Sequence, residues 1–220
     1  MSILDSVRTT VLVPIHREGY PFIGIAAAGT LLLALWGAWL TWPMLALTVW
    51  VVFFFRDPVR VTPVREGLVI APADGRVSMV AQAVPPVELG LGTAQRWRVS
   101  IFLSVLDVHV QRSPVGGTVK EVVHQAGKFL SADLADASEV NERNSMLIET
   151  ADGHDVAVVQ IAGLLARRIV CYAGVGDVLP IGDTYGLIRF GSRVDTYFPA
   201  GTTLLVEPGQ RTIGAETVIA

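Results

Sequence analysis

Three residues of this sequence, Asp74, His109 and Ser192, fit acid–base or nucleophilic chemistry, and none of them is diagnostic alone. Asp74 lies in the run Ala-Pro-Ala-Asp-Gly-Arg-Val, where Asp-Gly first indicates a turn. His109 follows an apolar run that begins at Phe102, and a single histidine in such a run is more often structural than catalytic. Gly191-Ser192 is a dipeptide found in almost any protein. Taken singly, these residues favour turns and core positions over catalysis.

The sequence lacks the motifs of several large enzyme classes. No serine lies in G-x-S-x-G, and there is no Walker loop, no H-E-x-x-H and no cysteine cluster. His124 and His154 do not have the spacing of metal ligands, and the single cysteine, Cys171, cannot form an internal disulfide. The sequence therefore predicts no metal site and argues against α/β-hydrolases, nucleotide hydrolases and the common zinc enzymes.

The composition indicates that membrane-facing sequence is combined with a globular domain. Of 220 residues, 51% are apolar and 17% charged, and the mean hydropathy is +0.51. The apolar excess lies in residues 21–55, which contain no Asp, Glu, Lys or Arg. A net charge of −3 argues against a nucleic-acid partner, because such proteins usually carry a basic stripe.

The uncharged segment predicts a hydrophobic helical hairpin. Because roughly 20 residues span a bilayer, 35 residues imply two helices, Phe22–Leu40 and Pro43–Phe55, with the break at Pro43. The second helix is only about 20 Å long, so a hairpin that dips into one leaflet and a hairpin that crosses the bilayer twice both remain open. The tryptophans of this segment favour the membrane–water interface; they are Trp36, Trp39, Trp42 and Trp50. The arginines that flank the segment predict that both of its ends lie in the cytoplasm; they are Arg8, Arg17, Arg56 and Arg60.

The rest of the chain predicts a mostly β (α+β) globular domain over residues 58–220, preceded by the hairpin-bearing segment 1–57. Ala151-Asp152-Gly153 indicates a hairpin turn, 133–141 a short helix, and 164–172 either a helix or a buried strand. The predicted strands are Gln95–Ser104, Gly117–His124, Ser145–Thr150, His154–Gln160, Tyr185–Phe190 and Thr203–Glu207.

The order of the motifs is more specific than any one of them. From about Phe55 to the C-terminus the chain resembles phosphatidylserine decarboxylase, most closely the short bacterial and archaeal proenzyme form, which also carries an N-terminal hydrophobic hairpin. The motifs that carry the resemblance are the Asp74 run, Phe-Leu-Ser with the following Asp-Val-His109, Gly127-Lys128-Phe129, Asn141-Glu142-Arg143-Asn144, Ala166-Arg167-Arg168-Ile169 and Arg189-Phe190-Gly191-Ser192-Arg193-Val194-Asp195.

The resemblance implies an enzyme that is made as an inactive chain and cuts itself between Gly191 and Ser192. Two chains would result, 1–191 and 192–220, and Ser192 would become a covalent pyruvoyl cofactor. That group would form a Schiff base with phosphatidylserine and release carbon dioxide and phosphatidylethanolamine. His109 would be the base that activates Ser192 and the later acid or base, and Asp74 would fix the histidine tautomer.

Two arginines are predicted to bind the substrate, and one of them marks a departure from the long form of the family. Long-form members carry a second histidine where this chain has Arg112, so either His109 performs both tasks or another group assists it. The planar guanidinium of Arg112 suits the phosphate or carboxylate of a substrate. An ordinary charged residue on the surface of a strand is an equally good interpretation of Arg112. Arg193, directly after the cleavage position, is the other predicted substrate ligand.

Three alternatives remain open. One is a pyruvoyl decarboxylase of another amino-headgroup substrate, and another is an Asp-His-Ser hydrolase whose chain never splits. The third is a membrane-tethered β-rich carrier or binding module, since 174–183 and 208–217 resemble turns of lipoyl-type barrels, although no lysine lies in a tight turn. The expected partners of the enzyme are phosphatidylserine, membrane lipid and its own cleaved chain, with a homodimer as a candidate assembly. The expected location is the inner face of the cell membrane.

Overall fold

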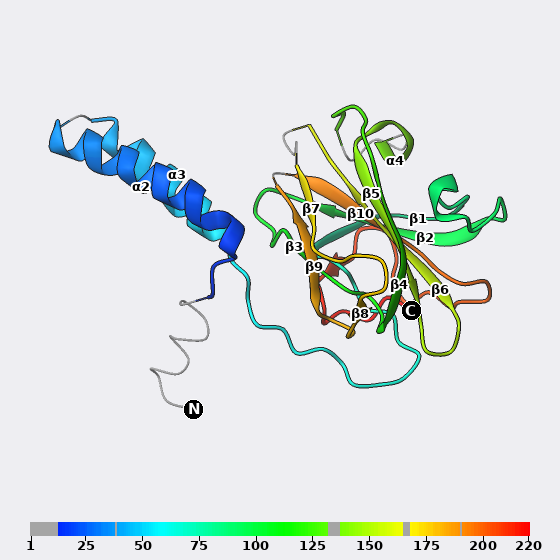
Figure 1. The fold of residues 1–220 in the computed structure, drawn as a ribbon. Helices are drawn as coiled ribbons and strands as arrows, with labels where there is room; N and C mark the ends of the chain where they lie inside the picture. The colour runs from blue at the N-terminus through cyan, green and yellow to red at the C-terminus, as the bar shows by residue number, and fades with distance from the viewer. Residues whose placement is uncertain (1–12, 38, 132–136, 165–167, 190) are drawn as a thin grey trace. The chain divides into compact units, whose positions relative to one another are not determined.

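The computed structural model describes residues 13–37, 39–131, 137–164, 168–189 and 191–220, which form two compact units, 1–59 and 60–220. Each unit is described by itself. Unit 1 contains a 3-10 turn and the two apolar helices, and unit 2 contains the β-strands (Figure 1). In the described part of unit 2, the regular elements besides strands are a 3-10 turn at Val87–Leu89 and the short helix α4, Ala137–Val140.

Unit 1 is a closed helical hairpin. The 3-10 turn Arg17–Gly19 leads into α2, Tyr20–Leu35, and α3 spans Thr41–Phe54. The entering and leaving chains are joined at the open end, where the His16 backbone N–H donates to the Phe55 carbonyl at 2.8 Å. The Thr30 and Thr48 hydroxyls lie 2.9 Å apart and link the two helices.

The hairpin confirms two helices but not their predicted bounds. α2 ends five residues before Leu40, because Gly37 adopts a φ of +65°, a left-handed conformation that terminates helices and suits glycine. α3 begins at Thr41, so Pro43 lies in its first turn and not at the break. Among the described residues, one helical segment, Arg17–Leu35, which joins the 3-10 turn and α2, is long and apolar enough to cross a membrane. The bend tryptophans Trp36, Trp39 and Trp42 are largely exposed.

Unit 2 consists of two antiparallel sheets. The larger sheet has the order β11-β1-β2-β10-β6-β5-β4-β8 and the smaller one β3-β9-β7. The bounds of the strands are β1 Gly75–Ala83, β2 Arg96–Leu103, β3 Val110–Arg112, β4 Gly117–Gln125, β5 Arg143–Glu149, β6 Asp155–Ile161, β7 Ile169–Cys171, β8 Val178–Leu179, β9 Thr184–Ile188, β10 Ser192–Tyr197 and β11 Arg211–Thr212.

The mostly β prediction is confirmed, and most predicted strands match observed ones. Thr203–Glu207 is an exception, because this segment does not form a strand. Its Leu205 N–H donates one hydrogen bond to the Ile219 carbonyl. The Ala151-Asp152-Gly153 turn is confirmed, with Gly153 at a φ of +77°. The segment 164–172 contains strand β7, and 137–140 is helical, whereas 132–136 and 165–167 lie outside the described residues.

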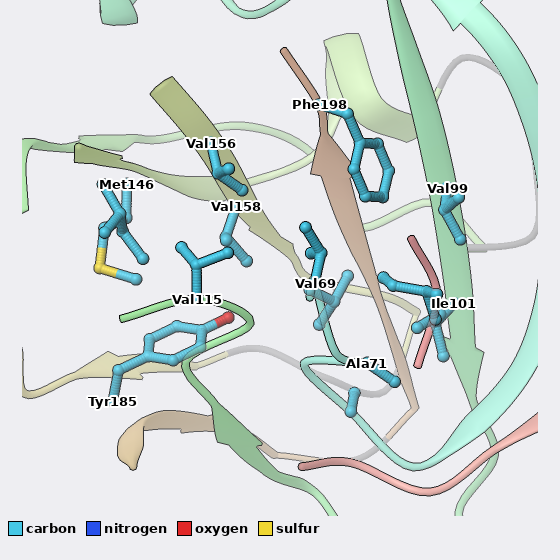
Figure 2. Packing of buried hydrophobic residues seen from close by; sticks show 14 of the residues in the cluster. Val69, Ala71, Val99, Ile101, Val115, Met146, Val156, Val158, Tyr185 and Phe198 are labelled. Carbon is cyan, nitrogen blue, oxygen red and sulfur yellow. The ribbon is translucent and has the colours of Figure 1, made fainter. Parts of the chain in front are cut away.

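The main core lies on the inner face of the larger sheet. Val99, Ile101, Val158 and Phe198 are fully buried there and belong to the cluster drawn in Figure 2. Alternation along β10 puts Ser192 and Val194 on this inner face, and Arg193, Asp195 and Tyr197 on the opposite face. The sheet therefore holds Ser192 at the edge of a dry interior.

Candidate active site

Gly191 and Ser192 lie where the chain enters the centre of the larger sheet. β10 pairs with β2 on one side and β6 on the other, and Ser192 is opposite Leu103. Gly191 has a φ of +69°, and a Cβ built on it would meet only Val105 Cγ1, at 3.9 Å. The position thus favours glycine because of its backbone conformation, not because of lack of space.

The Ser192 hydroxyl is buried and makes no hydrogen bond to the described residues. Ser192 is 0% exposed, and within the described part of the chain its Oγ has no hydrogen-bond partner. Leaving a buried polar group unpaired costs about 1–3 kcal/mol, so such groups in native structures call for an explanation, and a catalytic role is one.

His109 lies against the backbone of Gly191. Its Nε2 accepts a hydrogen bond from the Gly191 N–H at 3.2 Å, and its Nδ1 lies 2.9 Å from the Asp107 carbonyl oxygen. Because a nitrogen that accepts carries no proton, Nδ1 holds the ring proton and donates it to Asp107. The neutral imidazole therefore directs the lone pair of Nε2 at the N–H of Gly191, the residue directly before Ser192.

The turn before His109 is fixed by Asp107, which the sequence analysis overlooked. The Asp107 carboxylate accepts from the Ser104 N–H at 2.9 Å and from the Ser104 hydroxyl at 2.8 Å. Arg211 donates to its other oxygen at 2.7 Å. The carbonyl that orients His109 belongs to this turn, so the spacing Ser-x-x-Asp was the signal available in the sequence.

A row of buried amides supports the strand that begins after His109. Gln111 Nε2 donates to the His109 carbonyl at 2.8 Å, Gln160 donates to Gln111 at 3.0 Å, and Asn144 donates to Gln160 at 3.2 Å. A Cβ on Gly186 would lie 2.9 Å from Gln160 Nε2, so glycine leaves room for the row. A single sequence offered no signal for it, because the three amides come from different strands.

Asp74 lies beside the strand of His109, with its carboxylate held by other groups. The Ile70 N–H donates to Pro114 and the Arg112 N–H to Pro72, so residues 70–74 run antiparallel to 110–114. The Asp74 carboxylate accepts two bonds from Arg60, at 2.7 and 2.8 Å, and one from the Gly214 N–H at 2.8 Å. Its part in catalysis stays a prediction, while the observed contact at His109 Nδ1 is Asp107.

The two predicted substrate arginines lie in different surroundings. Arg112 is half-buried at the end of β3, three residues after His109. Arg193 is 1% exposed, and its Nε lies 3.0 Å from Asp195 on the face of β10 opposite Ser192. Binding of substrate by Arg193 would require this buried ion pair to open. Arg112 is therefore the better placed of the two.

The free cysteine, Cys171, is a poorer candidate for the nucleophile than Ser192. Burial raises the pKa of the Cys171 thiol, which keeps it protonated at neutral pH. Among the described residues, no three His, Cys, Asp or Glu side chains are arranged to hold a metal ion. A cavity of about 610 Å³ is lined by the β5–β6 turn and residues 199–202, at the end of the sheet away from Ser192.

Comparisons with known proteins agree on one family. A family model described as phosphatidylserine decarboxylase matches residues 47–220. The chain is 75% identical over 218 residues to a phosphatidylserine decarboxylase proenzyme of Rhodococcus erythropolis, covering 99% of this chain and 91% of the relative. The corresponding proteins of Rhodococcus jostii and Nocardia farcinica are 68% and 62% identical over the same shares of the two chains.

The geometry predicts which tautomer His109 adopts. In the uncleaved Ser192→Ala chain, at a pH where the imidazole is neutral, we expect the proton on Nδ1, because Nε2 accepts from Gly191. Long-range ¹H–¹⁵N NMR of the ring distinguishes the two nitrogens. The exposed His154 serves as the control, for which we expect averaged tautomers. A proton on Nε2 would contradict the described site.

Proposed function

Since the chain belongs to the phosphatidylserine decarboxylase family, whose members are carboxy-lyases, we propose that it cuts itself between Gly191 and Ser192 to become active. The observation that carries this proposal is the contact between His109 Nε2 and the Gly191 N–H, next to an unpartnered Ser192 hydroxyl. His109, the proposed base, thus contacts the left-handed Gly191, and the next residue along the chain is the nucleophile Ser192.

Cleavage begins with an N-to-O acyl shift. His109 Nε2 exchanges its bond with the Gly191 N–H for the neighbouring Ser192 hydroxyl and takes the proton from it. Ser192 Oγ then attacks the Gly191 carbonyl carbon, and the C–N bond breaks as the serine amine takes up the proton. The peptide bond is replaced by an ester. The absence of a side chain on Gly191 keeps its carbonyl carbon accessible.

The ester then divides the chain. Loss of the Ser192 α-proton breaks the Cβ–Oγ bond, so that Gly191 leaves as a carboxylate and Ser192 becomes dehydroalanine. Hydrolysis of the corresponding imine releases ammonia and leaves a pyruvoyl group at the start of chain 192–220. The site fits this group, because Ser192 is buried beside the apolar core and its hydroxyl has no structural partner in the described chain to lose.

Chain 192–220 is held in place independently of the broken bond. β10 keeps its pairing with β2 and β6, and the Arg193–Asp195 pair anchors the opposite face. β11 pairs with β1. The new chain end therefore stays beside His109.

In the mature enzyme the pyruvoyl carbonyl would condense with the substrate amine and draw electrons from the carboxylate that is lost. The residues of the chain have simpler tasks. His109 delivers or removes protons at the reacting carbon, since an imidazole is effective near neutral pH. Arg112, half-buried and close to His109 in the chain, binds the substrate phosphate or carboxylate.

The hairpin fits an enzyme whose substrate is a lipid. α2 and α3 are apolar on all sides, and the exposed tryptophans at their bend suit the headgroup region. Arg17 and Arg56 flank its open end and favour the cytoplasmic side. The hairpin would keep the catalytic unit at the inner face of the cell membrane.

Self-cleavage predicts two chains and a modified serine. Denaturing mass spectrometry of the wild-type protein should find chains 1–191 and 192–220, the smaller one lighter by one ammonia than a chain that begins with serine. Ser192→Ala should give one intact chain, and Ser78→Ala, an exposed serine, should cleave normally. An intact wild-type chain with unmodified Ser192 would overturn the proposal.

Replacing the base predicts slow cleavage. His109→Ala should reduce the rate by about 10²-fold or more, because proton transfer by a positioned side chain contributes about that much. The rate is measured by following chain splitting on denaturing gels after synthesis. His154→Ala removes an exposed histidine and should cleave at the wild-type rate. Unchanged cleavage in His109→Ala would place the base elsewhere.

The nearest alternative is a decarboxylase of another amino-headgroup substrate. Purified, cleaved enzyme given a mixture of such substrates should consume phosphatidylserine and release one carbon dioxide for each phosphatidylethanolamine formed. Lipid mass spectrometry identifies the products. Consumption of a different substrate while phosphatidylserine persists would favour the alternative.

A further inference from the structure

Three loops of unit 2 expose large leucines whose role neither the core nor the proposed chemistry explains. Leu106, Leu130 and Leu164 are 59%, 38% and 63% exposed, and we call them the leucine rim. Single exposed leucines are common on protein surfaces. The rim matters only if the three loops share one surface.

The strand register places the three loops at the same end of the larger sheet as Ser192. β2, β4 and β6 end there, and β10 begins there, since Leu103 pairs with Ser192 and Ile161 with Arg193. Leu106, Leu130 and Leu164 follow the ends of β2, β4 and β6, in that order. The same edge continues through the neighbouring pairs Arg143–Ile161 and Gln125–Arg143.

A buried amide clamps two of these loops together. Asn141 is 1% exposed, and its Nδ2 donates to the Leu130 carbonyl at 2.8 Å and to the Ala162 carbonyl at 2.9 Å. Its Oδ1 accepts from the Leu130 N–H at 3.0 Å. The loop of Leu130 is therefore fixed beside the residues that lead to Leu164.

The rim is bordered by positive charge. Lys128 and Arg168 are exposed in the loops of Leu130 and Leu164. Arg211, with 66% of its side chain exposed, is bound to Asp107, the residue after Leu106. The Arg189 N–H bonds to the Arg168 carbonyl at 3.2 Å, which ties this border to the segment that precedes Gly191.

We infer that the leucine rim is a docking surface for an anionic phospholipid bilayer, into which Leu106 and Leu164 insert while the border cations contact phosphates. Apolar side chains flanked by Lys and Arg are the features that bind the headgroup boundary of such membranes. The inference rests on the proposed function, since a lipid substrate must reach Ser192 from a bilayer. The rim would bring the site to the headgroups, a task distinct from tethering by the hairpin.

The test compares substrate in a bilayer with substrate in solution. Full-length Leu106→Ser/Leu164→Ser protein is assayed on phosphatidylserine in phosphatidylglycerol vesicles and on a short-chain phosphatidylserine below its micelle concentration. All rates are expressed per cleaved chain, measured by mass spectrometry. We expect kcat/KM to fall about tenfold on vesicles and to stay unchanged on the soluble substrate. A tenfold loss is the effect expected when two leucine side chains no longer bury part of their apolar surface in the bilayer.

Leu205→Ser is the matched control, because Leu205 is 59% exposed in the segment after the far end of β10. It should equal wild type on both substrates. Wild-type turnover of vesicles by the double variant would overturn the inference, as would an equal loss on both substrates, which would indicate damage to the site.

A second measurement does not depend on catalysis. An environment-sensitive label on Leu164→Cys, in a Cys171→Ser background, should shift to the blue on anionic vesicles, and the same label on Leu205→Cys should not. Absence of the shift at Leu164 would overturn the inference even for an active enzyme. A shift in a protein that decarboxylates neither substrate would leave the docking surface standing and refute the proposed function.

Discussion

One peptide bond governs the arrangement of the candidate site. Gly191-Ser192 joins a left-handed glycine to the first residue of a strand that is paired on both sides. The strand fixes Ser192, and the Gly191 N–H in turn is bonded to His109. Because the imidazole can accept this bond only in one neutral tautomer, the Asp107 turn that orients its other nitrogen is part of the same constraint.

The position of this bond also reconciles the proposed chain breakage with a stable fold. A cut in an exposed loop would cost little, whereas a cut at a central strand leaves a chain end within the core. Here the pairing with β2 and β6 begins at the first residues after the bond, and the buried Arg193–Asp195 pair lies on the reverse face. Covalent continuity is thus not needed to hold the strand, which allows the residue at its start to be used for chemistry.

The sequence predicted the parts of the structure that depend on local pattern. Apolar strands such as β2 and β6, buried along most of their length, and the apolar hairpin were found, because burial leaves a short apolar run or an uncharged segment in the sequence. β10, the strand of Ser192, was missed because its Arg193 and Asp195 look like a polar segment. Their pairing with each other, together with contacts to Arg98 and Ser138, makes their burial possible. The amide row of Gln111, Gln160 and Asn144 was equally hidden, since its members meet only through tertiary pairing.

A single histidine in two roles becomes less puzzling once the proposed cleavage products are considered. Before cleavage, His109 Nε2 accepts a hydrogen bond from a neutral peptide N–H, so this nitrogen is unprotonated. An unprotonated imidazole can act as a base. The proposed cleavage would turn Gly191 into a chain end that bears a carboxylate, next to the same ring. A negative charge at that distance stabilises the imidazolium, so the product of the first reaction favours the protonated form that can act as an acid in the second. In the same proposal Arg112, at the position of the second histidine of the long form, binds the substrate anion.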